Sequence, residues 1–179
     1  MMKRIAVVAA VVCTLLGGLL VAQAPPMPKP GPEHQRFHYF VGEWKNEGTM
    51  KASPWGPGGK FTGTDHNSML GDFFLVLHSE GTSPMGAMKE IAIMGYDAKE
   101  KTYTYDGFDN MGEHDTSKGS ISGNTWTWVS PEQEMGGKKV KGRFILKEVS
   151  STSYTYSYDT STDGGEWTNV MEGKATKVK

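Results

Sequence analysis

Cysteine is almost absent from this sequence, with Cys13 the only one among 179 residues. It lies in the middle of an apolar N-terminal segment, whereas an acylated lipoprotein cysteine stands at the end of such a segment. Removal of that segment would leave a chain without any thiol. Structural disulfides and a cysteine nucleophile are therefore excluded for the mature protein.

An excess of charge is also missing. The chain has 19 Lys and Arg against 20 Asp and Glu, a formal net charge of −1, and no basic stripe. Nucleic-acid binding is excluded on this ground, because it needs a concentrated positive surface. Long apolar runs are absent after the N-terminal segment, which excludes a polytopic membrane protein. The length and the 37% hydrophobic content indicate a single globular domain.

The first 24 residues have the pattern of an export signal. Lys3 and Arg4 precede an uncharged run over residues 5–20, and the small residues Ala22 and Ala24 follow it. We predict a signal peptide over residues 1–24, cleaved near Ala22 to Ala24, and a periplasmic or secreted protein. Pro25 disfavours cleavage after Ala24, so an uncleaved segment anchored in the inner membrane stays open as an alternative.

Residues 25–32 contain five prolines and are predicted to be a linker, and residues 33–179 are predicted to be one domain. The domain opens with a short helix over 32–41, because Pro32 suits a first turn and Gly42 can end it. Phe37, Phe40 and Val41 share one apolar face of that helix.

After Gly42 the sequence is typical of β-structure, because aromatic residues alternate with Ser and Thr, as in 153–158 and 125–128. Short turn segments separate ten predicted strands, and 73–77 is apolar throughout, which indicates a strand covered on both faces. Short connections favour antiparallel hairpins, and closure removes the sheet edges. We predict an all-β, up-and-down antiparallel barrel with an interior cavity. The predicted strands are 43–52, 60–70, 72–82, 86–96, 101–109, 113–121, 125–130, 139–148, 153–160 and 166–177.

Three glycine- and aromatic-containing motifs carry a family resemblance. They are Val41-Gly42-Glu43-Trp44 with Gly48-Thr49-Met50, Met94-Gly95-Tyr96-Asp97, and Asp109-Asn110-Met111-Gly112. The sequence resembles the bacterial domain-of-unknown-function 1579 family, whose members are calycin-like, lipocalin-like barrels. The resemblance implies that Trp44 closes one barrel end beneath the helix, with structural roles for Gly42, Gly95, Tyr96 and Asp97. It implies no catalytic residues.

No cofactor and no metal site are predicted. The related nitrobindin-like haem barrels carry their iron-ligating histidine on the last strand, and residues 166–178 contain no histidine. His34 and His38 have a chelating i, i+4 spacing without an evident third ligand. The nine methionines after residue 24 could bind Cu(I), but methionine more often fills a core or cavity.

The predicted function is binding of a small, partly apolar molecule inside the barrel. The candidate ligand-binding residues are Phe74, Val76, His78, Tyr103, Tyr105, Asp109, His114, Trp126 and Trp128. Which face of each strand points inward is open, because a slip of one residue exchanges the faces.

Two alternatives for the function stay open. The first is an enzyme that uses a histidine and a carboxylate of the interior as acid and base, with His114 or His78 in that role. The second is an envelope interaction module with a packed barrel. The only partner predicted is a small hydrophobic or amphipathic molecule; a membrane partner follows only from an uncleaved signal, and the oligomeric state stays undetermined.

Overall fold

The structure of the protein is a computed structural model that describes residues 27–53 and 56–178. The predicted signal peptide lies outside the described residues. Within those ranges, the helical segments are too short and too polar to cross a bilayer.

The domain begins with a short helical segment that has two parts. The helix α1 spans Pro32–Gln35, and the 3-10 helix η1 spans Arg36–Phe40. Proline at the first helical position needs no hydrogen-bond partner for its nitrogen, which suits a helix start. Phe37 and Phe40 are buried, as the predicted apolar face requires. The predicted helix is therefore confirmed in position, although only its first turn is α-helical.

Eleven strands follow in the described chain and form one antiparallel sheet. They are β1 (Gly42–Met50), β2 (Gly59–Leu70), β3 (Phe74–Ser83), β4 (Gly86–Asp97), β5 (Thr102–Asp109), β6 (His114–Ser122), β7 (Thr125–Val129), β8 (Gln133–Met135), β9 (Lys138–Ser150), β10 (Ser153–Thr162) and β11 (Thr168–Lys177).

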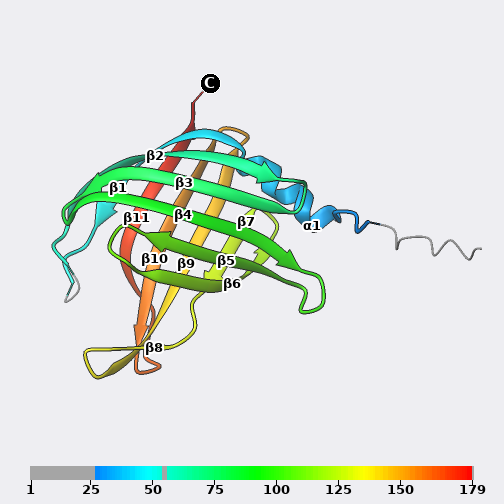
Figure 1. The fold of residues 1–179 in the computed structure, drawn as a ribbon. Coiled ribbons are helices and arrows are strands. Elements are labelled where there is room, and N and C mark those ends of the chain that lie inside the picture. The colour runs from blue at the N-terminus through cyan, green and yellow to red at the C-terminus, as the bar shows by residue number, and fades with distance from the viewer. Residues whose placement is uncertain (1–26, 54–55, 179) are drawn as a thin grey trace, which may run out of the picture.

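The sheet closes on itself as a ten-stranded barrel. Sequential strands are neighbours, β7 pairs with β9, β9 pairs with β10, and β11 returns to pair with β1. The short β8 pairs with β9 alone and projects at one end of the barrel (Figure 1). The predicted all-β antiparallel barrel of ten strands is confirmed. Residues 131–138, between two predicted strands, were expected to be a turn segment only. This was wrong, because they contain β8.

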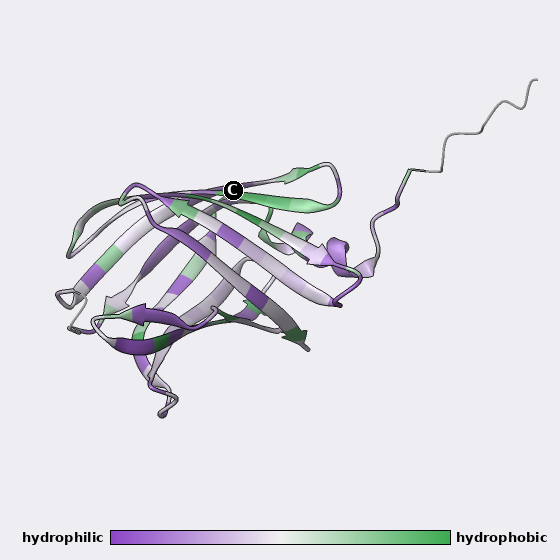
Figure 2. Ribbon diagram, turned by 60° about the horizontal axis from the view of Figure 1, so that its bottom comes forward, coloured by the Kyte–Doolittle hydropathy of each residue, from purple (hydrophilic) through white to green (hydrophobic). Residues whose placement is uncertain are grey.

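Each strand places alternate residues inside the barrel and outside it, so hydrophilic and hydrophobic residues follow one another along the ribbon (Figure 2). The prediction that 73–77 is covered on both faces was wrong. Leu75 is fully buried inside, whereas Phe74 on the other face is 44% exposed. The helical segment packs inside the barrel end, so it leaves the outer face of β3 open to solvent.

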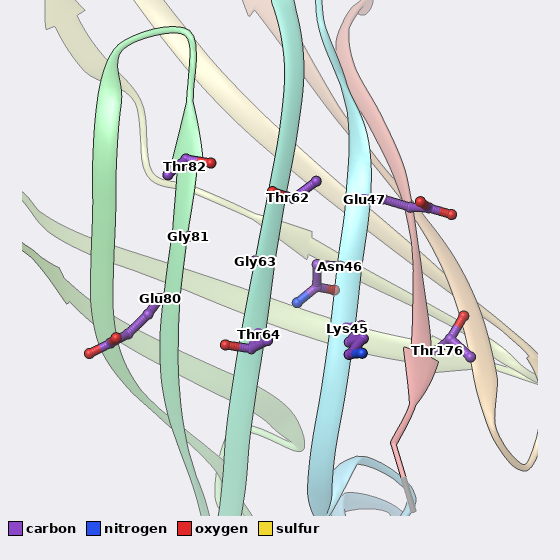
Figure 3. Close-up of a pocket in the computed structure, with 10 residues that line it drawn as sticks. All are labelled: Lys45, Asn46, Glu47, Thr62, Gly63, Thr64, Glu80, Gly81, Thr82 and Thr176. Atoms are coloured by element: carbon purple, nitrogen blue, oxygen red, sulfur yellow. The ribbon is translucent and has the colours of Figure 1, made fainter.

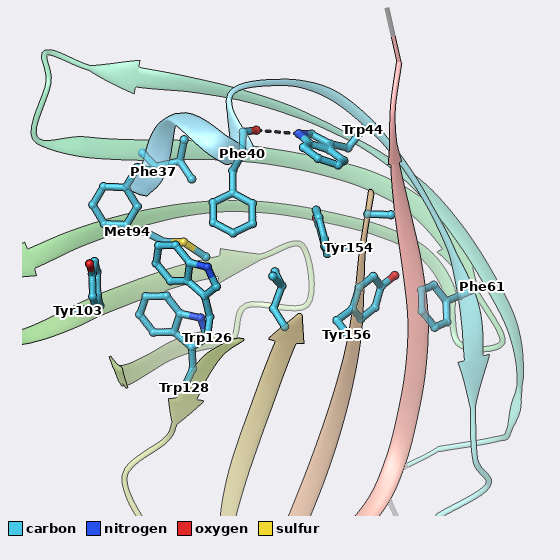
Figure 4. Close-up of a cluster of buried hydrophobic side chains, with 13 residues drawn as sticks. Phe37, Phe40, Trp44, Phe61, Met94, Tyr103, Trp126, Trp128, Tyr154 and Tyr156 are labelled. Carbon is cyan, nitrogen blue, oxygen red and sulfur yellow. Dashed lines mark hydrogen bonds between the residues drawn. The ribbon is translucent and has the colours of Figure 1, made fainter. Parts of the chain in front are cut away.

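One end of the barrel is closed by an aromatic plug, which we define as Phe37, Phe40, Trp44, Trp126 and Tyr154 (Figure 4). The Nε1 atom of Trp44 donates a hydrogen bond of 2.7 Å to the Phe40 carbonyl oxygen. The ring centroids of Trp44 and Tyr154 are 4.9 Å apart. Burial of large rings at these distances is the main stabilising contribution at this end of the fold.

Glycines inside the strands make room for rings on the neighbouring strand. A Cβ atom at Gly119 would collide with the indole of Trp128, and one at Gly142 would collide with the ring of Tyr158. Gly119 lies directly opposite Trp128 in the pairing of β6 with β7. The rings of Trp128 and Tyr158 can therefore lie against the barrel wall because the glycine beneath each ring has no side chain.

The residues of the resemblance motifs lie at ends of strands and under rings. Gly42 has φ +115°, a left-handed conformation in which glycine is favoured, where the chain turns from η1 into β1. Tyr96 packs edge-on against His34 of α1. The ring of Phe74 lies over Gly95 on the outer face. The Asp97 carboxylate accepts backbone N–H bonds from Glu100 and Lys99, which hold its pKa below the usual value.

Candidate functional site: the barrel cavity

A cavity of about 430 Å³ lies inside the barrel, beyond the aromatic plug. Its walls carry mainly apolar and aromatic side chains from the inward faces of the strands, among them Phe61, Met94, Tyr105, Trp128 and Tyr156. Exposed residues of the turn between β5 and β6, including Met111, also line it, so the cavity opens to solvent at the end opposite the plug. The volume falls within the usual range of small-molecule sites.

Two carboxylates, Asp65 on β2 and Glu90 on β4, belong to the cavity wall. Burial raises the pKa of Asp65, although hydrogen bonds from the side chains of Asn46 and Ser79 oppose this shift. Burial also raises the pKa of Glu90. Both groups are therefore desolvated, and their charged forms are disfavoured relative to carboxylates in water.

Glu90 has one direct side-chain partner, the hydroxyl of Tyr105, which donates to its Oε1 atom. Burial and the neighbouring Glu90 charge both raise the pKa of Tyr105, so the phenol keeps its proton and acts as a donor. Gly107 makes room for this pair, since a Cβ atom there would lie 2.6 Å from the Tyr105 hydroxyl and 2.7 Å from Glu90 Oε1. The carboxylates of Asp115, Asp65 and Asp109 add to the upward shift in the pKa of Glu90.

Four predicted aromatic residues point into the barrel, but only two reach the cavity. Tyr105 and Trp128 line it, with ring centroids 6.3 Å apart. Tyr103 and Trp126 are buried against Phe37 in the plugged end. Their alternation on β5 and β7 is as predicted. Ligand binding by Tyr105 and Trp128 stays a prediction.

The prediction that Phe74, Val76 and His78 line the interior was wrong. Leu75 and Leu77 occupy the inward positions of β3, so the residues between them point outward. The run 73–77 is apolar at every position, so the sequence pattern could not distinguish the two faces. The choice of face was therefore off by one residue along the whole strand.

Asp109 and His114 both lie at the open end, but they do not form one site. Asp109 Oδ1 accepts backbone N–H bonds of 2.9 Å from Met111 and Glu113, so this carboxylate holds the turn between β5 and β6. The His114 ring stacks on Phe108 on the outer surface, with 51% of its side chain exposed. Its Nε2 atom lies 3.4 Å from Asp106. His114 is therefore outside the cavity, contrary to the prediction.

None of the five histidines lines the cavity. His66 and His78 are on outer faces of their strands, and His38 is exposed. His34 is buried in α1, where its Nδ1 atom accepts the Gly31 N–H at 3.0 Å. In the described ranges, 27–53 and 56–178, no three His, Cys, Asp or Glu side chains are grouped as metal ligands would be.

Sequence reasoning missed Asp65 and Glu90, two carboxylates of the cavity wall, although the predicted Asp109 also belongs to the lining. The alternation along the strands could have revealed them. Asp65 lies on the same face of β2 as the buried Phe61, and Glu90 lies on the same face of β4 as the buried Met94. A correct choice of face for either strand would have placed a carboxylate inside the barrel. The polar residues Thr62, Thr64 and His66, although prominent in the sequence, lie on the outer face.

A second hollow lies on the outside of the barrel across β1, β2 and β3 (Figure 3). Its volume is about 660 Å³. It is lined by polar and charged residues, including Lys45, Thr64 and Glu80, together with Gly63 and Gly81. The two glycines lie opposite each other in the strand pairing, and the wall has no side chain at these positions. The hollow is a broad polar depression, without the enclosing rings of the cavity.

The fold is a calycin-like barrel. Ten antiparallel strands close on themselves, a helical plug covers a buried tryptophan, and a cavity lies inside. The chain belongs to the family described as "Protein of unknown function (DUF1579)", whose model matches residues 29–177. No curated protein matches the sequence.

Solved structures provide similarity of fold. The crystal structure of Rv2717c from M. tuberculosis superimposes with a TM-score of 0.58 at 10% sequence identity, over 84% of this chain and 100% of that one. A second structure, EF1p2_mFAP2b bound to DFHBI, has a TM-score of 0.46 at 12% identity, over 81% of this chain and 98% of that one. The first similarity shows that the two proteins share the barrel fold.

Proposed function

We propose that this protein is exported and that its barrel binds a small, partly apolar molecule in the cavity. The observation that carries the proposal is the cavity of about 430 Å³ with aromatic and methionine walls. Protein interiors are normally close-packed, so a space of this size lined mainly by apolar side chains is typical of a ligand site. Export rests on the sequence pattern of residues 1–24.

The two other candidate functions have less support. An enzyme that uses His78 or His114 as acid and base would need an inward histidine, and both rings lie on the outside of the barrel. An interaction module with a packed barrel would leave no space for a ligand, whereas the open end leads into the cavity. In this proposal, Asp65 and Glu90 bind and orient the ligand.

The binding proposal is tested on the mature protein purified from its own periplasm. Native mass spectrometry should detect a bound small molecule, and its release should lower the melting temperature, because a ligand of the folded state stabilises it. Ser117→Trp would fill the cavity from β6 and should abolish the bound mass. Ser120→Trp, on the exposed face of the same strand, is the matched control. A bound mass that persists in Ser117→Trp would place the ligand elsewhere.

The export proposal has a separate test. Mass spectrometry of the protein from fractionated cells should give an N-terminus at residue 23 or 25 in the periplasmic fraction. A chain that begins at Met1 and stays with the inner membrane would support the anchored alternative instead.

A further inference from the structure

The cavity has an excess of negative charge that its own wall does not neutralise. Asp65 and Glu90 point inward, and Asp115 lies closer to the mouth. Among the described residues that line the cavity, Lys89 is the only basic one. Its Nζ atom pairs at 3.1 Å with Glu80, and both side chains are largely exposed on the outer side of the barrel. Among the described residues, no ion pair reaches Asp65 or Glu90.

The two enclosed carboxylates act on the same space. The charge of Asp65 contributes to the upward shift in the pKa of Glu90, so the two groups lie within each other's field. Neutral donors from Asn46, Ser79 and Tyr105 supply their hydrogen bonds. Neutral donors offset only part of the cost of removing a carboxylate from water. A cation between the two groups would offset the remainder.

One buried acceptor at the plugged end of the barrel lacks a donor among the described residues. Asn67 follows Asp65 at the next inward position of β2, and its Nδ2 atom donates at 3.1 Å to the Phe40 carbonyl. Its Oδ1 atom is buried and accepts no hydrogen bond from the described residues. Buried acceptors are nearly always paired. Asn67 belongs to the plugged end and is not part of the cavity lining, so this acceptor lies apart from the carboxylates that would hold a ligand.

The apolar part of the wall suits the rest of such a ligand. The ring of Tyr105, whose hydroxyl is hydrogen-bonded to Glu90, has its centroid 6.3 Å from that of Trp128. On the paired strands β9 and β10, Phe144 and Tyr156 stack with centroids 5.6 Å apart and also line the cavity. Burial raises the pKa of Tyr156, which keeps its phenol neutral. The faces of electron-rich rings attract cations and also pack well against apolar groups. The wall thus combines negative charge and ring faces around one space.

We propose that the cavity is selective for an amphipathic organic cation, with its ammonium group held by Asp65 and Glu90 and its apolar part packed against Tyr105, Trp128 and Tyr156. This inference rests on the proposed function, because it names the chemical class of the ligand for the same cavity. An anion of the same shape would be repelled by the two carboxylates. A neutral analogue would bind more weakly than the cation, because it does not offset the cost of removing the carboxylates from water.

The test uses three probes that share one naphthalene ring and differ in the polar group. They are 2-(2-naphthyl)ethylamine, 2-(2-naphthyl)ethanol and 2-naphthylacetate, each titrated into the mature protein at pH 7.5 by isothermal calorimetry. The amine should bind at least about 10-fold more tightly than the alcohol, as expected for a charge-assisted hydrogen bond in an enclosed site. The acetate should bind more weakly than the alcohol.

Near-isosteric variants connect the selectivity to the two carboxylates. Asp65→Asn and Glu90→Gln should each weaken amine binding by about 10-fold and leave alcohol binding within about 2-fold. Asp106→Asn, on the outer face of β5, is the matched control and should change neither affinity. Thermal unfolding of each variant shows whether the barrel stays folded.

Each outcome has a defined meaning. If the wild-type protein binds the amine and the alcohol equally, selectivity for a cation is refuted, and binding in the cavity stands. If the amine is preferred and folded Asp65→Asn and Glu90→Gln retain the preference, these residues are not the recognition groups. If none of the three probes binds, the proposed function itself is overturned, because the apolar wall does not accept a two-ring ligand.

Discussion

Replacement of Glu90 by glutamine should make the protein more stable at neutral pH. Glutamine has the same shape as glutamate, and its amide oxygen can still accept the hydrogen bond from Tyr105. What the substitution removes is a desolvated negative charge without a cationic partner among the described residues. Such a charge costs about 1–3 kcal/mol more than a satisfied neutral group. We expect the free energy of unfolding of Glu90→Gln to exceed that of the wild type by about that amount at pH 7.5.

The gain should depend on pH in a defined direction. Burial raises the pKa of Glu90 in the folded state, so between its unfolded and folded pKa values the folded protein binds more protons. The free energy of unfolding of the wild type therefore falls as the pH rises through that window. The fall is about 1.4 kcal/mol for each pH unit between the unfolded and folded pKa values of Glu90. Below the unfolded pKa, about 4.3 for a glutamate, the variant and the wild type should differ little.

Urea denaturation at pH 4, 5.5 and 7.5, followed by tryptophan fluorescence, measures this difference. Glu43→Gln is the matched control, because Glu43 is exposed on the outer face of β1. It should change the free energy of unfolding by less than about 0.5 kcal/mol at every pH. A Glu90→Gln protein that is less stable than the wild type at pH 7.5 would falsify the view that this carboxylate is an uncompensated charge.

Three further perturbations have expected outcomes. Trp44→Ala should lower the free energy of unfolding by about 3–5 kcal/mol in urea denaturation, because it empties the centre of the plug. Gly107→Ala should displace the Tyr105 hydroxyl and lower the melting temperature, since the new Cβ atom would lie 2.6 Å from it. Arg143→Ala should destabilise the protein by about 1–3 kcal/mol at pH 7, because Arg143 pairs with Asp159 at 2.7 Å. That loss should shrink in acid, measured by the same denaturation at pH 3.

The sign of the acid effect follows from the environment of Asp159. Burial alone would raise its pKa, but hydrogen bonds from Arg143 and Asn169 outweigh burial and lower it. A lowered pKa in the folded state stabilises the protein above the unfolded value of about 3.9, and this contribution is lost as the pH falls through the folded value. An Arg143→Ala difference that persists unchanged at pH 3, or a stable Trp44→Ala protein, would contradict these expectations.

The strand plan could be read from the sequence because it depends on local chemistry. Thr125 to Trp128 and Ser153 to Tyr158 alternate so regularly that the strand type is evident. Glycine and asparagine punctuate the turns, as at Gly123-Asn124. These signals act over two to four residues, and they placed all ten strands of the barrel.

The contents of the cavity could not be read in the same way. On β3 both faces are apolar over 74–77, so the pattern does not distinguish the inward face from the outward one. On β2 the inward face carries Asp65 and Asn67, where apolar residues are usual. A buried carboxylate is costly and therefore unexpected from pattern alone. His114 was predicted to be a possible acid or base, yet it is the first residue of β6 at the rim, where its ring points outward.

The sequence by itself determined the class of this protein: a β-barrel with a helical plug, because period-2 alternation, turn residues and the Gly-x-Trp start are local properties of the chain. Only the tertiary structure decided which face of each strand is inside, because the inward face is chosen when strands far apart in sequence close the ring. Closure also brought Asp65 and Glu90, on strands separated by β3, to one apolar space. The charge of that space, and with it the class of ligand proposed, is therefore a property of the closed barrel.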